Sequence, residues 1–490
     1  SPSSVGHMTV DLHYASLCDV AVRIASGNLD SVGVTGHLVA RIERLEPHLH
    51  AFNEVTAERA QQEARAADVA RDRGEELGPL HGVPIGIKDL CMMRGTATTG
   101  GHSFRKNLID ESNATVVQRL QASGAIILGK LATTEGAMAG YHPDFEIPRN
   151  PWATDRWPGV SSSGPGVATA AGLCFGSLGT DTGGSIRYPS SANGIVGLKP
   201  TWGRVSRSGV LDLAPTLDHV GPMARTVRDA ARMLSVISGY DDDDPTTLRS
   251  ADVDFEAALD QGVAGLRIGW DEKYAGRAAP HVFKAVRSVV EELSDAGTEI
   301  VEVAVPTVDE TVAWRTIASA EAAVVHQETF PSRVSDYGEN FRGLLTKAHK
   351  ITDVERADAY LARERAVKRM MPVFEHIDLL VCPTVAAETF RYESNDAYGG
   401  LDEARGTSCG IPLEWYEASE CFTKIWNYNG YPTLCLPCGS SDDGMPLSVQ
   451  FAGPPLSEGI LCRAGHVFEQ ATNWHMKHPE VEGEGEFNAR

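Results

Sequence analysis

Three places in this sequence carry side chains that together could cleave an acyl bond. Lys88 ends the short apolar run LHGVPIGIKDL at residues 80–90, Ser161 lies among small residues at 159–164, and Ser185 follows the glycines of GTDTGGSIR at 179–187. A serine hydroxyl is a weak nucleophile until a neighbouring base takes its proton. A lysine amine can be that base only when it is neutral, so the chemistry depends on where Lys88 lies.

The residues around these side chains favour such a role. The apolar stretch 83–87 predicts a buried strand ending near Lys88. Burial disfavours the charged amine and lowers its pKa from an ordinary value of about 10.4. Glycine reaches backbone angles closed to other residues, so the glycines before Ser185 would let successive N–H groups converge on one oxygen. We also expect Arg187 to pair with a buried carboxylate, with Asp181 as the candidate.

The elements that must position these groups follow one another in a mixed order, which predicts a sheet between layers of helices. Besides the strand near Lys88, strands are expected at residues 125–128, 194–198, 266–269, 299–303, 377–381, 433–437 and 447–452. Helices are expected over residues 13–50, 56–76, 224–239, 279–296, most of 307–376, and 456–474.

Other catalytic patterns fit less well. Residues 181–183 read DTG, as in aspartic proteases, but those enzymes need two carboxylates and no second DTG or DSG is present. The serine elbow G-x-S-x-G does not occur around Ser161 or Ser185. Residues 103–106 match S-x-x-K, a pattern expected about once by chance in a chain this long.

The combination of Lys88, Ser161, Ser185 and GTDTGGSIR resembles the amidase signature family. Further matching stretches are NGIVGLKPTWGRVSRSG at 193–209, HVGPMART at 219–226, NGYP at 429–432 and DGMPLSVQ at 443–450, and the resemblance extends over about residues 15–478. It implies an α/β fold with a large mixed central β-sheet between α-helices, forming one domain over residues 8–490. The signature core would span about 80–240 and a variable substrate-pocket region about 307–430. Residues 1–7 (SPSSVGH) are interpreted as a vector remnant.

The resemblance also implies a role for each matching residue. Ser185 corresponds to the nucleophile, Ser161 to the bridging serine on a cis peptide bond, and Lys88 to the general base. The backbone N–H groups of Thr182, Gly183, Gly184 and Ser185 correspond to the oxyanion hole. Substrate-pocket residues are predicted at Tyr141, Ser162 and Trp426, with further aromatic candidates at Trp314, Trp415 and Tyr416. No metal and no cofactor is expected.

The leading functional hypothesis is hydrolysis of a carboxamide through an acyl-enzyme on Ser185. A carbamate (urethane) or ester hydrolase, a glutaminase subunit of a tRNA amidotransferase, and a non-catalytic binding protein are the alternatives. This sequence departs from the family pattern at Val160 and Ser163, where glycines are usual, and at Pro165, where a small residue is usual. These departures affect the backbone beside Ser161 and leave the three reactive side chains in place.

Composition limits the partners and the setting. The 490 residues carry a formal charge of −22 without a dense basic patch, which argues against nucleic-acid binding. No apolar run reaches the ~18 residues of a membrane span, so no membrane association is expected. The nine cysteines are scattered and odd in number, which indicates a reducing, cytoplasmic setting. We therefore expect a monomer or homodimer acting on a small molecule.

Overall fold

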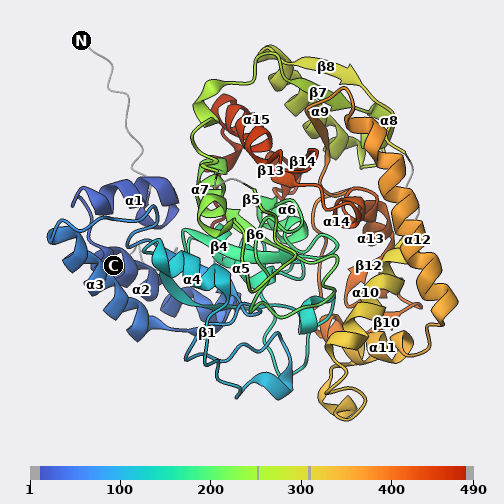
Figure 1. Ribbon diagram of the computed structural model, residues 1–490, viewed down its shortest axis with the longest axis horizontal. Coiled ribbons are helices and arrows are strands. Elements are labelled where there is room, and N and C mark those ends of the chain that lie inside the picture. Colours follow the sequence, from blue (N-terminus) through green and yellow to red (C-terminus); the bar gives the residue numbers. More distant parts are fainter. Residues whose placement is uncertain (1–10, 251–252, 307–310, 482–490) are drawn as a thin grey trace.

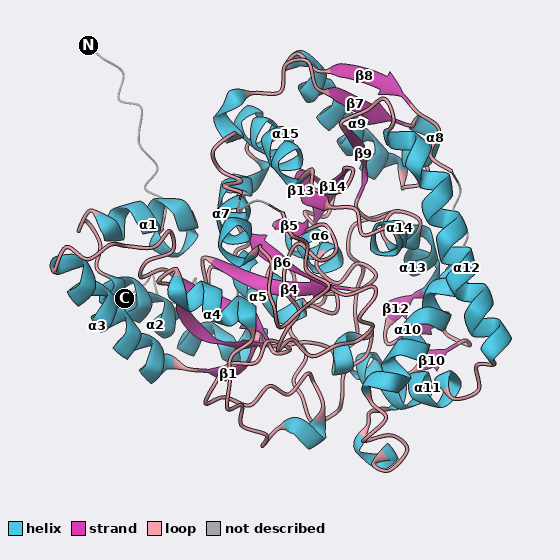
Figure 2. Ribbon diagram, in the orientation of Figure 1, coloured by secondary structure: helices cyan, strands magenta, loops and turns pink. Residues whose placement is uncertain are grey.

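The computed structural model describes residues 11–250, 253–306 and 311–481; the interpreted vector remnant at 1–7 lies outside them. Its centre is a mixed sheet of 11 strands within these residues, flanked by helices (Figures 1 and 2). The strand order is β1-β3-β2-β4-β6-β5-β13-β14-β9-β7-β8. The predicted fold class is therefore confirmed.

The strands of this sheet are β1 Phe52–Val55, β2 Pro84–Lys88, β3 Ile126–Leu131, β4 Gly176–Asp181, β5 Val196–Lys199, β6 His219–Ala224, β7 Arg267–Trp270, β8 Glu299–Glu302, β9 Leu379–Pro383, β13 Thr433–Ser440 and β14 Pro446–Ala452. A small second sheet contains β10 Leu401–Asp402, β11 Thr407–Ser408 and β12 Ile411–Pro412.

The helices gather at both ends of the large sheet and along its faces (Figure 1). They are α1 Leu17–Ala25, α2 Ser31–Leu49, α3 Ala57–Asp72, α4 Thr115–Ala122, α5 Ser163–Ala170, α6 Arg187–Asn193, α7 Val227–Ile237, α8 Glu272–Ala275, α9 Pro280–Asp295, α10 Thr311–Val325, α11 Glu339–Ala348, α12 Asp353–Met370, α13 Leu413–Glu420, α14 Lys424–Tyr428 and α15 Glu458–Ala471.

Two central strands, β4 and β6, were not predicted from the sequence. Every residue of both strands is buried, and the two strands pair antiparallel along their whole length. A strand buried on both faces shows no alternation of polar and apolar residues. The small residues of β4 therefore gave no period-two pattern to detect.

The strand directions bring the predicted site together. β2 runs parallel to β4, so Lys88 at the end of β2 and Asp181 at the end of β4 lie at the same edge of the sheet. Helix α5 starts just after Ser161, helix α6 starts just after Ser185, and the two helices pack against each other. Pro165 is the third residue of α5, in the first turn, where its missing N–H costs no helical hydrogen bond.

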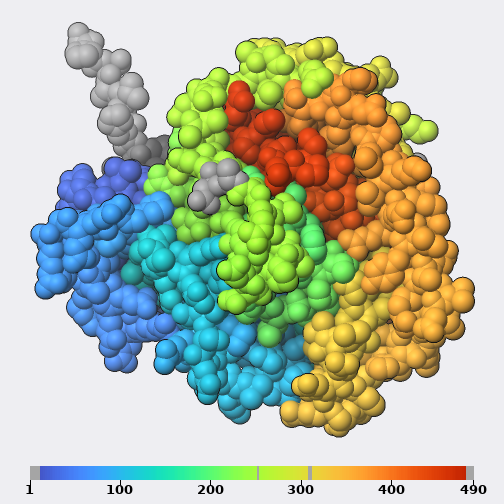
Figure 3. All heavy atoms as spheres, viewed as in Figure 1, coloured from blue at the N-terminus to red at the C-terminus, as the bar shows by residue number. Residues whose placement is uncertain are grey.

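The predicted pocket region forms one flank of the molecule. Helices α11 and α12 pack on α10, and this yellow-to-orange part of the chain covers the right side of the face in Figure 3. Among the described residues, no helix is long and apolar enough to cross a membrane, and no group of three or more His, Cys, Asp or Glu side chains could hold a metal. The nine thiols are all free.

Candidate active site

The amine of Lys88 lies in a fully buried pocket of hydroxyl groups. Its Nζ is 2.8 Å from the Oγ atoms of Ser161 and of Ser162, and 2.7 Å from Oγ1 of Thr180. No ion pair between Lys88 and a carboxylate is found in the described part of the chain. Burial therefore lowers the pKa of this amine to about 7, although Cys91, Asp181 and Asp218 act in the opposite direction.

The hydrogen atoms in this pocket can be assigned from the contacts. A hydroxyl has one proton to donate, and Ser162 donates its own to the carbonyl oxygen of Thr180 at 3.1 Å. Ser162 must therefore accept a hydrogen bond from Lys88. A neutral amine has two N–H groups and one lone pair, so when two N–H groups bind Ser162 and Thr180, the lone pair faces Ser161.

Ser161 follows a cis peptide bond with Val160, as the resemblance implied. Val160 is buried beside Tyr188 in an apolar cluster, so the residue that departs from the glycine pattern is accommodated by packing. Across the site, the backbone N–H of Ser162 donates to the carbonyl oxygen of Ser185 at 3.2 Å. This bond joins the chain segment of Ser161 to that of Ser185.

Ser185 lies at the end of the serine loop, as we call residues 182–185 between β4 and α6. It is partly exposed, whereas the residues on either side of it are buried. The N–H groups of Thr182, Gly183 and Ser185 form no hydrogen bond within the described residues. An accessible hydroxyl beside unpaired backbone donors is the arrangement that acyl transfer requires.

Among the predicted oxyanion donors, the N–H of Gly184 has a hydrogen-bond partner within the protein. The N–H of Gly184 donates to Oδ1 of Asp181 at 2.9 Å, so it is already used within the protein. Gly184 has φ +139°, and a Cβ there would lie 2.6 Å from the ring of Tyr188. Glycine is needed here for the shape of the loop, and the N–H groups of the loop that have no partner in the described residues are those of Thr182, Gly183 and Ser185.

A buried ion pair anchors both ends of the serine loop. Arg187 donates from Nε and Nη2 to the two oxygens of Asp181, each at 2.9 Å, which confirms the predicted pair. Asn427 also donates to Asp181 at 2.8 Å. Burial alone would raise the pKa of the Asp181 carboxyl, but the Arg187 guanidinium holds it well below its usual range. The charged pair thus fixes the strand end to the start of α6.

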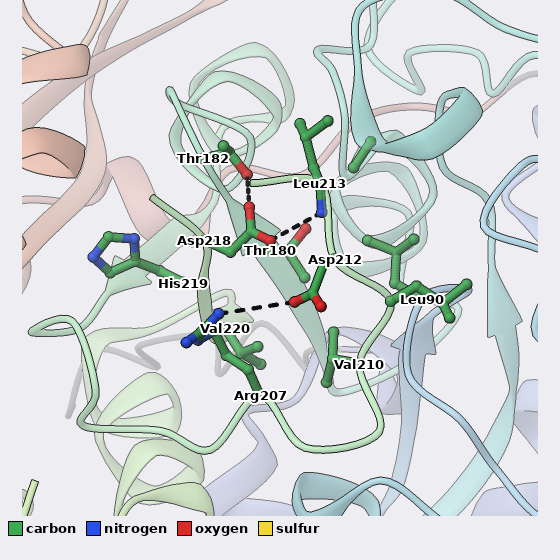
Figure 4. Close-up of a pocket in the computed structure, with 12 residues that line it drawn as sticks. Leu90, Thr180, Thr182, Arg207, Val210, Asp212, Leu213, Asp218, His219 and Val220 are labelled. Atoms are coloured by element: carbon green, nitrogen blue, oxygen red, sulfur yellow. Dashed lines mark hydrogen bonds and ion pairs between the residues drawn. The ribbon is translucent and has the colours of Figure 1, made fainter. Parts of the chain in front are cut away.

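Thr182 is fixed at two of its atoms. Its Oγ1 donates to Oδ1 of Asp218 at 2.6 Å, as the dashed line in Figure 4 shows. Its carbonyl oxygen accepts a hydrogen bond from Nε1 of Trp314 at 3.0 Å. Burial raises the pKa of the Asp218 carboxyl to about 7. Neither Asp218 nor Thr180 was predicted as a site residue, although Thr180 lies within one matching stretch and Asp218 directly precedes another.

A cavity of about 400 Å³ adjoins the serine loop through Trp314. Its apolar lining includes Met138, Trp314, Leu344, Ile411, Leu413 and Tyr416, and its polar lining includes Arg315, Ser319, Glu339, Asn340 and Lys347. The candidates Trp314 and Tyr416 therefore line a cavity. The volume of this cavity is typical of small-molecule sites.

The three residues predicted for the substrate pocket do not line this cavity. Tyr141 is 2 % exposed and donates to Oγ of Ser163 at 2.6 Å. Ser162 is buried against Lys88, as described above. Trp426 is fully buried, donates to the carbonyl oxygen of Phe422, and packs against Phe374. All three are interior positions, and for Tyr141 and Trp426 aromatic type alone did not separate them from cavity-lining residues.

The sequence and the fold match a known enzyme family. The model of the amidase family matches residues 33–462 of the chain. The chain belongs to the amidase signature family and is a hydrolase that acts on amides.

Individual relatives show the breadth of that family. A Mycobacterium tuberculosis protein named "Putative amidase AmiD" is 41 % identical over 467 residues, covering 95 % of this chain and 96 % of that protein. A glutamyl-tRNA(Gln) amidotransferase subunit of Chloroflexus aggregans is 36 % identical, and the match covers 96 % of this chain and 99 % of that protein. The structure of a peptide amidase from Stenotrophomonas maltophilia superposes with a TM-score of 0.81 at 30 % identity, covering 96 % of this chain and 100 % of that one.

Proposed function

We propose that the protein is a free-standing amidase in which Ser185 is the nucleophile, Ser161 relays its proton and Lys88 is the base. The single observation that carries this proposal is the buried, carboxylate-free amine of Lys88 at 2.8 Å from Ser161. No metal or cofactor has a part in it.

The reaction has two halves. Ser185 Oγ attacks the amide carbonyl carbon while its proton passes to Ser161 and the proton of Ser161 passes to Lys88. The tetrahedral intermediate places its negative oxygen among the N–H groups of Thr182, Gly183 and Ser185. The C–N bond then breaks, the amine leaves with the proton returned from Lys88, and an acyl ester remains on Ser185. Water attacks this ester by the same proton path, releasing the acid and restoring the serine hydroxyl.

The test is covalent labelling combined with turnover. A fluorophosphonate probe should label the wild-type chain at Ser185, and Ser185→Ala should remove both labelling and hydrolysis. Ser441→Ala, a buried serine far along the chain on the loop after β13, is the matched control and should retain both. Hydrolysis that survives in Ser185→Ala would contradict the proposal.

The cavity supports a substrate class. Because its apolar lining includes Met138, Tyr416 and Trp314, the last of which contacts the serine loop, we propose amides that carry a bulky, mainly apolar group. Carbamates and esters pass through the same tetrahedral geometry and are proposed as secondary substrates. The preference for bulky apolar groups is measured with a series of anilides and primary amides whose acyl groups increase in size. The value of kcat/KM should rise along the series until the cavity is filled.

The second candidate is a glutaminase subunit that works with partner proteins in a small oligomeric complex. The observation in its favour is the 36 % identity with a tRNA amidotransferase subunit over nearly the whole chain. The apolar cavity wall favours the free-standing amidase, because glutamine has no large apolar group to bury. Glutamine hydrolysis by the purified chain that exceeds its hydrolysis of apolar amides would reverse this choice. We propose a cytoplasmic setting for either function.

A further inference from the structure

Trp314 links the cavity to the serine loop, although it lies 132 residues beyond Thr182 in the chain. Its indole is 4 % exposed and lines the cavity with its remaining surface. A Cβ on Gly183 would lie 2.7 Å from Cζ2 of the indole, so the ring rests directly on the backbone of the loop. Its N–H binds the carbonyl oxygen of Thr182 at 3.0 Å.

This hydrogen bond determines the direction of an oxyanion donor. The carbonyl group of Thr182 and the N–H group of Gly183 belong to the same peptide unit. A trans peptide is planar, and its C=O and N–H point in opposite directions. Because the carbonyl oxygen of Thr182 points toward the indole of Trp314, the N–H of Gly183 must point away from the indole. The serine loop alone would leave this peptide free to rotate, because glycine permits several backbone conformations.

The indole is itself held by a buried charge. Nζ of Lys424 lies 4.1 Å from the ring centroid of Trp314 and 4.9 Å from that of Tyr416. Lys424 pairs with Glu420, and both side chains are almost fully buried. An ammonium over the face of an indole is attracted by the ring, more strongly when water is excluded. The position of Trp314 is thus set by its surroundings before any substrate binds.

We propose, on the basis of the function proposed above, that Trp314 is a positioning residue that aims the Gly183 N–H and couples it to the filling of the cavity. The same ring forms the wall against which the apolar part of a substrate packs. A substrate that fills the cavity presses the indole onto the loop and keeps the donor aligned. Amides with a large apolar group should therefore gain in kcat as well as in binding.

The test compares two tryptophans that each donate to a backbone carbonyl. Trp314→Phe keeps an aromatic ring and loses the N–H. Trp152→Phe is the matched control, because Trp152 donates to the carbonyl oxygen of Asn193 at 2.8 Å and lies outside the cavity. For an amide that fills the cavity, kcat should fall about tenfold in Trp314→Phe with KM changed less than about twofold, since a misaligned oxyanion donor acts on the transition state.

Two further readouts separate positioning from general damage. The inhibition constant of an aldehyde or boronic acid that forms a tetrahedral adduct on Ser185 should rise in proportion to the loss of kcat/KM. Trp314→His, which returns a ring N–H, should recover part of kcat. All rates are divided by the amount of fluorophosphonate-reactive Ser185, so that unfolded molecules do not count.

The proposal is overturned if Trp314→Phe keeps the kcat and inhibitor affinity of the wild type and of Trp152→Phe, or if its whole loss lies in KM. A wild-type chain that neither reacts with the fluorophosphonate nor hydrolyses any amide would instead refute the function on which this inference rests. The two failures are therefore distinct.

Discussion

The pH dependence of catalysis tests the environment of Lys88 most directly. With a pKa of about 7, the amine is neutral in about one tenth of the molecules at pH 6 and about nine tenths at pH 8. The value of kcat/KM should rise about tenfold per pH unit below pH 7 and be level above pH 8. With the ordinary lysine pKa of 10.5, only about one molecule in 300 would be neutral at pH 8, and the rate would still be rising at pH 10.

Thr180→Val perturbs this environment in a calculable way. The substitution keeps the shape of the side chain and removes a hydroxyl at 2.7 Å from Nζ of Lys88. A hydrogen bond to a charged group is worth about 1 kcal/mol more than one to a neutral group, so the ammonium form loses more than the neutral amine. At about 1.36 kcal/mol per pKa unit, the acid limb should move to lower pH by about 0.7 unit.

The assay is kcat/KM for an anilide between pH 5.5 and 10, with Thr98→Val as the matched control. Thr98 accepts a hydrogen bond at 2.6 Å from Lys130, another buried lysine, and its replacement should leave the acid limb where it is. A wild-type profile that keeps rising above pH 8 would refute the lowered pKa of Lys88. An active Thr180→Val enzyme whose acid limb stays in place or moves to higher pH would refute the assignment of the limb to Lys88.

Three further predictions concern stability and the corrected pocket. Lys88→Met should abolish turnover. The pKa of Lys88 is lower in the folded than in the unfolded protein, so the unfolded chain binds more protons between pH 7 and 10.5. The contribution of Lys88 to the free energy of unfolding therefore rises with pH over this range. The difference in free energy of unfolding between Lys88→Met and the wild type, measured in guanidinium, should therefore shrink by about 2–3 kcal/mol between pH 6.5 and pH 9. A difference that stays constant with pH would contradict the lowered pKa of Lys88. Arg187→Met should cost about 3–5 kcal/mol by leaving Asp181 charged and buried, and the double change with Asp181→Leu should recover part of the lost melting temperature. Tyr141→Phe should lower stability by about 1–2 kcal/mol through the bond lost to Ser163 and leave KM unchanged; a large rise in KM would return Tyr141 to the substrate pocket.

The chemistry-bearing residues could be located from the sequence because their combination resembles the amidase signature family, although each motif taken singly has an ordinary structural interpretation. Lys88 follows a β-branched apolar run, and the run is a fully buried strand. Arg187 was expected to pair with a buried carboxylate, with Asp181 as the candidate, and the two residues, six apart on either side of a glycine loop, form that ion pair. The order of strands and helices likewise predicted the class of fold. These features depend on neighbours in the chain, which a single sequence displays.

The cavity could not be predicted in the same way. Trp314 and Trp426 are both tryptophans in helical segments of the same region, yet one lines the cavity and the other is fully buried against Phe374. The difference comes from which elements pack against each helix, and the sequence does not state that. The same limit explains Gly184, whose N–H is used by Asp181 because the strand end and the loop curve toward each other.

Two buried lysines in adjacent strands have different surroundings. Lys130 and Lys88 are both completely buried, at the ends of β3 and β2, which pair in parallel. Lys130 lies 3.3 Å from the carboxylate of Asp89, so this buried amine has an ion-pair partner. Lys88 has only the hydroxyls of Ser161, Ser162 and Thr180 around it, which can solvate either form of the amine but cannot neutralise a charge. The two buried amines therefore differ in their partners: a carboxylate lies beside Lys130, whereas the Lys88 amine, whose pKa burial lowers to about 7, lies among hydroxyls.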